Sequence, residues 1–171
     1  MPAGGTKWSV DVNPREALIQ AVREAAQQGD WDEVLRLAMV HFEAGVSTLH
    51  RHRRPDDLLE LVAQSGLPEV LLPTVGAIPV GKGMAGLAAA RREPVQVCNL
   101  QTDESGQAKP GAKLTRMEGS IALPILVEDE LLGTFGVGKP VPHQYTPDEV
   151  ALLEEIATVI GQRLRNERSP S

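Results

Sequence analysis

The end of the chain carries the pattern that most constrains the fold, a long amphipathic helix with a clear beginning. Thr146, Pro147 and Glu149 have the spacing of a capping box with proline at the first helical position. Apolar residues then recur at helical spacing, at Val150, Leu153, Ile156, Ala157, Ile160 and Leu164. Such a stripe has to be covered, because leaving it in water is unfavourable. Either a sheet of the same chain or a partner helix must cover it, and the length of the stripe leads us to expect a homodimer.

The first part of the chain predicts a pair of helices over residues 13–44. Asn13 can cap the first helix and Pro14 suits its first turn, and apolar residues follow at helical spacing until Gly29. Asp30 begins the second helix by the same logic, and Gly45 ends it. Residues 1–12 and 166–171 are expected to be flexible ends.

Between these helices the pattern changes to that of strands. A hairpin is predicted over residues 46–64, and a strongly apolar pair of strands over residues 120–127 and 131–139. An extended segment, a short helix over residues 84–92 and a short strand over residues 95–98 lie between the two pairs. Strand hairpins with helices at both chain ends predict an α+β fold built on an antiparallel sheet.

Charge and composition exclude several classes of partner. The 17 basic and 23 acidic residues give a net charge of −6, so the chain has no general attraction to nucleic acid or to anionic membranes. The one basic cluster, residues 50–54, is interpreted as a solvated hairpin tip. No window approaches the roughly 18 apolar residues of a membrane span. With Cys98 as the single cysteine, no internal disulfide can form, and a cytoplasmic location is expected.

The segments in the middle and at the end of the chain resemble the GAF domain family. The most characteristic is residues 78–86, IPVGKGMAG, and the others follow the family order at residues 59–66, 93–97, 119–125, 131–137 and 145–153. The resemblance implies a GAF-like domain over residues 45–165, with an antiparallel sheet, terminal helices on one face and a pocket on the other. It also implies that segments near residues 67–92 and 99–118 roof the pocket. The pocket residues expected from the resemblance are Ile78, Val80, Met84, Cys98, Asn99, Ser120, Leu123 and Phe135.

Some members of the family, the free methionine-R-sulfoxide reductases, are enzymes that work through cysteines. In the matching segment this chain has Ala85 where their cysteine would stand, and the loop over residues 99–118 has no cysteine. A thiol redox cycle needs an attacking thiol and usually a resolving one. Cys98 alone cannot supply both, so we expect that this mechanism does not carry over.

Other chemistries lack the residues that they need. Residues 76–83 resemble a P-loop, but Gly83 stands where a hydroxyl would bind magnesium. Ser120 has no evident His or acid partner, and His50 and His52 are too few for a zinc site. The family's cyclic-nucleotide set and its bilin cysteine have no counterpart, and no haem ligand is evident. We therefore expect no metal and no cofactor.

These observations favour a non-enzymatic sensory or regulatory domain. It would bind a small molecule or an unidentified signalling protein and act through its terminal helices or a dimer. The alternative is an adaptor whose pocket is filled by its own side chains, with Ala85, Ala88, Ala89 and Ala90 packing the short helix on the sheet. A cavity of about 300 Å³ or more with convergent polar groups would favour the sensory domain over the adaptor.

Overall fold

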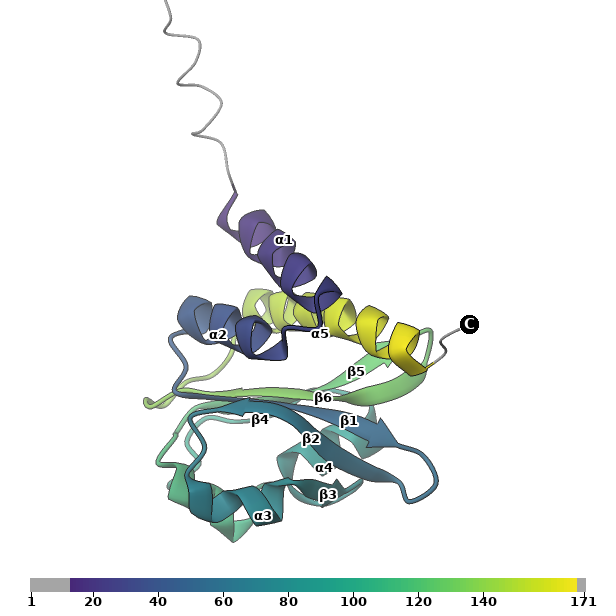
Figure 1. The fold of residues 1–171 in the computed structure, drawn as a ribbon. Coiled ribbons are helices and arrows are strands. Elements are labelled where there is room, and N and C mark those ends of the chain that lie inside the picture. Colours follow the sequence, from purple (N-terminus) through teal and green to yellow (C-terminus); the bar gives the residue numbers. More distant parts are fainter. Residues whose placement is uncertain (1–12, 169–171) are drawn as a thin grey trace, which may run out of the picture.

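The structure, a computed structural model, describes residues 13–168 (Figure 1). Two helices come first, α1 (Pro14–Gln27) and α2 (Trp31–Phe42). A hairpin of β1 (Val46–Arg53) and β2 (Leu58–Ser65) follows, then η2 (Glu69–Leu71), α3 (Leu72–Val75) and β3 (Ala77–Pro79). After α4 (Gly83–Arg91), β4 (Val95–Val97) and η3 (Pro110–Thr115), the chain forms β5 (Ser120–Val127), β6 (Glu130–Gly138) and α5 (Pro147–Arg168). The α+β fold expected from the sequence is confirmed.

The strands form one antiparallel sheet of six, in the order β3-β2-β1-β6-β5-β4. The two predicted hairpins therefore lie next to each other, with β1 and β6 at the centre. In β5 and β6, Leu123 lies opposite Phe135, and Ile121 lies opposite Val137. Because side chains alternate between the two faces of a strand, this register places these four side chains on one face.

The helices α2 and α5 cover that face of the sheet, and α1 packs on the outer side of these two helices, as Figure 1 shows. One core cluster contains Val22 of α1, Leu35 of α2 and Ile156 of α5, together with apolar residues of the sheet. The apolar stripe of α5 is buried in this core, with Leu153, Ile156 and Ile160 each 0% exposed. The stripe thus covers the chain's own sheet, which is one of the two alternatives that the sequence left open.

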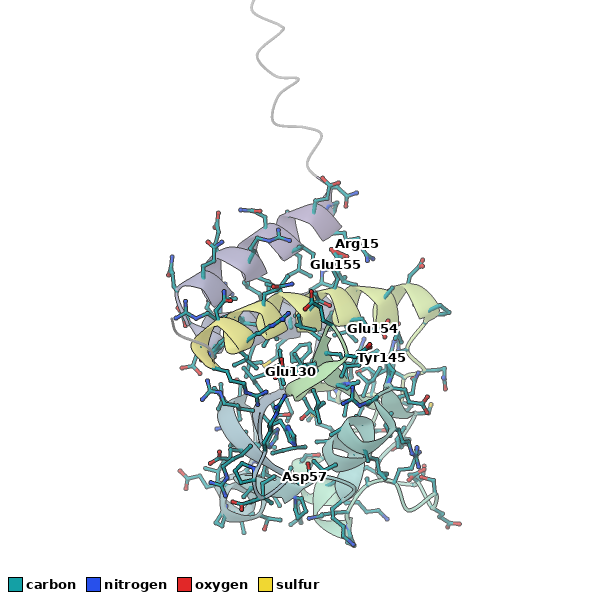
Figure 2. The ribbon with its side chains drawn as sticks, turned by 90° about the vertical axis from the view of Figure 1, so that its right-hand side faces the viewer. Arg15, Asp57, Glu130, Tyr145, Glu154 and Glu155 are labelled. Atoms are coloured by element: carbon teal, nitrogen blue, oxygen red, sulfur yellow. The ribbon has the colours of Figure 1, made fainter. Side chains whose placement is uncertain are left out.

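The N-terminal helices belong to the same structural unit as the sheet. Both share the core with α5, and the ion pair of Arg15 with Glu155 joins α1 to α5 at 2.9 Å (Figure 2). The helical pair before residue 45 and the sheet after it therefore form one structural unit.

The starts of the helices follow the predicted capping residues. The Oδ1 atoms of Asn13 and Asp30 accept hydrogen bonds from N–H groups in the first turns of α1 and α2. The capping box of α5 is also present, because Thr146 Oγ1 accepts from Glu149 N at 3.1 Å and Glu149 Oε1 accepts from Thr146 N at 2.9 Å.

The C-terminal helix is longer than the sequence predicted. It continues to Arg168, whose guanidinium donates to Glu130 at 2.6 Å and to the carbonyl oxygen of His52 at 2.8 Å. Residues 166–168 are therefore helical rather than part of a flexible end. The flexible ends expected at residues 1–12 and 169–171 lie outside the described residues.

Candidate ligand-binding site

The face of the sheet away from α5 is roofed by α3, α4 and η3, and between roof and sheet lies a half-open cavity of about 360 Å³, the large cavity. Its floor is β1, and its walls come from the segments before α4 and around η3. The lining residues are Thr48, His50, Leu67, Leu71, Thr74, Val75, Ile78, Lys82, Gly83, Ala85, Lys109, Pro110, Gly111, Ala112 and Thr115. Its walls are thus mostly aliphatic, with a few polar groups among them.

A tight turn before α4 determines where the helix enters this site. Gly81 and Gly83 have φ values of +97° and +66°, a region that favours glycine. Gly86 lies against the same turn, since a Cβ added there would come within 2.6 Å of the Pro79 carbonyl oxygen. This close approach seats the first turn of α4, with Lys82 and Gly83, at the edge of the large cavity.

His50 provides the most buried polar group of the cavity lining. Its side chain is 1% exposed, and its Nε2 lies 2.9 Å from the carbonyl oxygen of Val75. A carbonyl only accepts, so Nε2 carries the hydrogen and Nδ1 presents a lone pair. Burial lowers the pKa of His50, and the hydrogen bond to Val75 only partly offsets this, so the ring is neutral near pH 7. Nδ1 has no partner among the described residues, and neither has Oγ1 of the neighbouring Thr134.

The charged side chains of the lining are all basic. Lys82 and Lys109 line the large cavity, and neither makes an ion pair within residues 13–168. No aspartate or glutamate lines it. The first turn of α4 has no side-chain cap, so its N–H groups add further positive potential at this edge.

A second, smaller cavity of about 140 Å³ lies beside the first and shares Thr48, Ala85 and Thr115 with it. Met84 and Ser120 line this small cavity. Both cavities thus lie beside α4, on the side of the sheet that carries no terminal helix.

Three of the eight predicted pocket residues line the cavities: Ile78, Met84 and Ser120. Val80 packs beside them, in an apolar cluster with Leu59 and Leu131. The other four, described next, do not line either cavity.

Leu123 and Phe135 are a correction to the predicted site. Both are 0% exposed in the core under α5. Leu123 follows Ala122, which lines the small cavity, so its side chain points to the opposite face, and Phe135 lies opposite Leu123 on that face. Cys98, predicted to end a strand over residues 95–98, follows β4 and is exposed outside both cavities. The Oδ1 of Asn99 accepts from Gln101 N at 2.9 Å, so it holds a loop turn.

The polar residues of the large cavity, above all His50 and Thr48, were not predicted from the sequence. His50 was assigned with its basic neighbours to a solvated hairpin tip, whereas only Arg53 and Arg54 of that cluster are exposed. The signal was present in the alternation of β1, since Thr48 and His50 share a face two residues apart. Lys82 and Lys109 have no such pattern, because the roof segments that carry them are irregular.

Within residues 13–168, no group of three or more His, Cys, Asp or Glu side chains is placed to hold a metal ion. Nor is any helix in that range long and apolar enough to cross a membrane.

The sequence of residues 13–165 matches the model of the GAF domain family, and this chain belongs to that family. The matched region includes α1 and α2 as well as the sheet. No curated protein sequence matches the chain significantly.

Solved structures share the fold at low sequence identity. The GAF domain of a phosphoenolpyruvate-protein phosphotransferase from Acinetobacter has a TM-score of 0.76 at 13% identity, covering 92% of this chain and 96% of that one. The corresponding domain from Coxiella burnetii has a TM-score of 0.75 at 18% identity, over 91% and 97%. The free methionine-R-sulfoxide reductase of Neisseria meningitidis, solved with its substrate, has a TM-score of 0.74 at 15% identity, over 90% of each chain.

Proposed function

We propose that this GAF domain is a non-enzymatic sensory module of the cytoplasm, which binds a small molecule in the large cavity and signals through its terminal helices. The observation that carries this proposal is the cavity itself. Its volume of about 360 Å³ exceeds the roughly 300 Å³ at which ligand pockets begin, and its mostly apolar lining includes Thr48, His50, Lys82 and Lys109.

The alternative is an adaptor with a filled pocket. In its favour, Ala88 and Ala89 of α4 are buried and bring the helix close to the sheet. The space beside α4 nevertheless stays open, and His50, which lines it, has a buried Nδ1 without a partner among the described residues. An unpaired buried polar group costs about 1–3 kcal/mol, which a ligand that pairs with it recovers. This favours ligand binding over the adaptor.

The similarity to methionine sulfoxide reductases does not favour the same reaction here. Ala85, at the position that matches the reductase cysteine, lines both cavities and presents only a methyl group. Cys98 lines neither. An assay with free methionine sulfoxide and thioredoxin tests this directly, and turnover that disappears in Cys98→Ser would overturn the non-enzymatic proposal.

The effect of ligand binding is proposed to be transmitted through α1 and α5 to a signalling protein or to a second copy of the chain. The sheet joins the cavity to α5, because Thr48 on the cavity side and Leu49 on the helix side are consecutive residues of β1. A ligand that shifts β1 therefore acts on the core that α5 shares.

Native mass spectrometry of the protein purified from its own host tests ligand binding and assembly together. The expected result is a retained small molecule on a dimer. A protein without bound ligand, which also takes up none from an extract of the host's metabolites, would leave the adaptor as the better description.

A further inference from the structure

The large cavity has a charge opposite to that of the chain around it. The protein has a net charge of −6, with 23 acidic residues. The cavity lining nevertheless holds two lysines and no carboxylate. A hollow lined by one sign of charge concentrates ligands of the other sign. The two lysines, both exposed at the edge of the cavity, therefore favour an anion over a cation.

The helix α4 adds to this selection. It has nine residues, begins at Gly83 on the cavity wall, and has no side-chain cap. The N–H groups of its first turn have no carbonyl partners within the helix, and the dipole of the helix favours a negative charge there. Ala85, in the same turn, also lines the cavity. A carboxylate next to Lys82 would accept hydrogen bonds from the Lys82 ammonium and from the N–H groups of the first turn of α4.

His50 adds a second requirement. Its ring is buried, its Nε2–H is used by Val75, and its Nδ1 is an acceptor without a partner among the described residues. A carboxylate oxygen cannot satisfy Nδ1, because both atoms are acceptors. A ligand group that reaches this nitrogen has to be an O–H or N–H donor.

The walls define the remainder of the molecule. They are formed by Leu67, Leu71, Val75 and Ile78, and no phenylalanine, tyrosine or tryptophan lines the cavity. A flat purine or haem would therefore find none of these rings to stack on. The volume of about 360 Å³ lies near the lower end of ligand pockets, which run from about 300 to 1,000 Å³.

We propose that the ligand is a small aliphatic carboxylate that also carries a hydroxyl or N–H donor, with its carboxylate at Lys82, Lys109 and the start of α4 and its donor at His50. This inference rests on the proposed sensory function and specifies the ligand of the same site.

The test is a matched panel of small molecules with aliphatic skeletons of four to six carbons. Each skeleton is tested as the acid, the primary amide and the amine, with and without a hydroxyl group, by ligand-observed NMR and by titration calorimetry. Hydroxy acids are expected to bind best, and their affinity should fall as salt is added, because salt screens the lysines. Amides or amines that bind as well as the acids would overturn the proposal, and so would a panel in which no acid binds at millimolar concentration.

Lysine variants locate the charge. Lys82→Met and Lys109→Met are each expected to weaken binding of the best acid by about tenfold, which corresponds to about 1.4 kcal/mol. Lys113→Met is the matched control, because Lys113 lies in η3, four residues after Lys109, but does not line the cavity. Equal weakening in all three variants would show a general charge effect and contradict the proposed carboxylate position.

The donor at His50 is tested in the unaltered protein. In protein labelled with ¹⁵N-histidine, the Nδ1 resonance of His50 should move upfield when the hydroxy acid binds and stay in place with the acid that lacks the hydroxyl. His50→Leu should remove the preference between these two acids. An unmoved Nδ1 resonance on saturation with the hydroxy acid would refute the assignment of the donor.

This inference and the proposed function can fail separately. If native mass spectrometry finds a retained neutral or cationic molecule, the domain is a ligand sensor and the carboxylate assignment is wrong. If no ligand of any kind binds, the sensory function itself is rejected.

Discussion

The Nε2 of His50 lies 2.9 Å from the carbonyl oxygen of Val75 and so joins the central strand β1 to the roof of the large cavity. The residues are 25 positions apart, and one lies on the floor of the cavity and the other in its wall. The roof is also held by a backbone bond from Leu61 N to the carbonyl oxygen of Gly76 at 2.9 Å. The neutral His50 ring is therefore part of what keeps the roof closed over the sheet.

We predict that this histidine makes the protein less stable at mildly acidic pH. Burial lowers the pKa of His50 below its ordinary value of 6.5, so the unfolded chain binds this proton more readily than the folded protein. The free energy of unfolding should therefore fall as the pH drops below about 6.5. The lining offers Lys82 and Lys109 but no carboxylate to stabilise a charged ring. Urea unfolding between pH 7 and pH 5 measures the effect.

The control for this prediction is His50→Gln, which keeps an N–H donor for Val75 but does not titrate. The difference in unfolding free energy between the two proteins removes the contribution of His41, His52 and His143. Wild type should lose more stability than the variant over this range. Parallel pH profiles would mean that His50 has the same pKa in the folded and the unfolded protein, which would contradict the prediction.

The capping box of α5 should contribute measurably to stability. Thr146→Ala removes the acceptor for Glu149 N and should lower the free energy of unfolding by about 1 kcal/mol. Thr158→Ala is the matched control, because the Thr158 hydroxyl only donates back to the carbonyl oxygen of Glu154 within α5. Chemical denaturation of both variants tests this, and equal stabilities would show that the cap adds nothing.

The stabilising effect of Glu149 is also lost as the pH falls, but at a lower pH than that of His50. Burial raises its pKa, but the Thr146 N–H and the ring of His143 outweigh this, so the pKa lies below its ordinary value of 4.5. A carboxyl group of this kind stabilises the fold above its unfolded pKa, and the stability is lost as the pH falls through the folded pKa. Its effect appears below about pH 4.5 and is separate from that of His50.

The turn before α4 should not tolerate a side chain at Gly86. A Cβ there would come within 2.6 Å of the carbonyl oxygen of Pro79 and 3.0 Å of Gly81 N, and neither backbone atom can move alone. Gly86→Ala should therefore cost about 1–3 kcal/mol, despite the better helix propensity of alanine. Gly111→Ala is the control, because its Cβ would meet only a Leu71 methyl at 3.6 Å. Thermal unfolding compares them, and equal melting temperatures would contradict the close approach.

The sequence predicted the helix starts correctly, because the interactions that cap a helix are local. The capping residues Asn13, Asp30 and Thr146 need only neighbours within three positions, and they were assigned correctly. Which face of the sheet a strand residue points to depends on register, and a slip of one residue exchanges the faces. The pairing of β1 with β2 shifts between Leu49 and His50, an irregularity with no sequence signature.

The polar residues of the large cavity were also hard to predict, because they come together only through non-local packing. Its polar groups come from β1, from the start of α4 and from η3, which are brought together only by the packing of the roof. The family segment at residues 78–86 located the wall at Ile78. It carries no information on which residue of β1, such as His50, faces that wall.

Substitutions at Leu123 and Ile78 should separate the core from the ligand site. Leu123 is 0% exposed under α5, so Leu123→Ala should lower the free energy of unfolding by about 2–5 kcal/mol. Ile78 lines the cavity at the sheet edge and is only partly buried, so Ile78→Ala should cost less stability but weaken ligand binding. Denaturation and calorimetry on both variants measure the two effects. If folded Leu123→Ala lost ligand affinity as strongly as Ile78→Ala, the assignment of Leu123 to the core alone would fail.

If the domain signals as a homodimer, the dimer must form through a surface other than the apolar stripe of α5. That stripe is buried against the sheet, which leaves the groove of about 420 Å³ between α1 and α5, where Val159 is partly buried. Val159→Lys should therefore shift the protein towards monomer in sedimentation equilibrium at tens of micromolar. Val40→Lys is the control, because Val40 is 67% exposed on α2, outside the groove. A wild-type protein that sediments as a monomer would reject the dimer, and output would then depend on a different protein binding these helices.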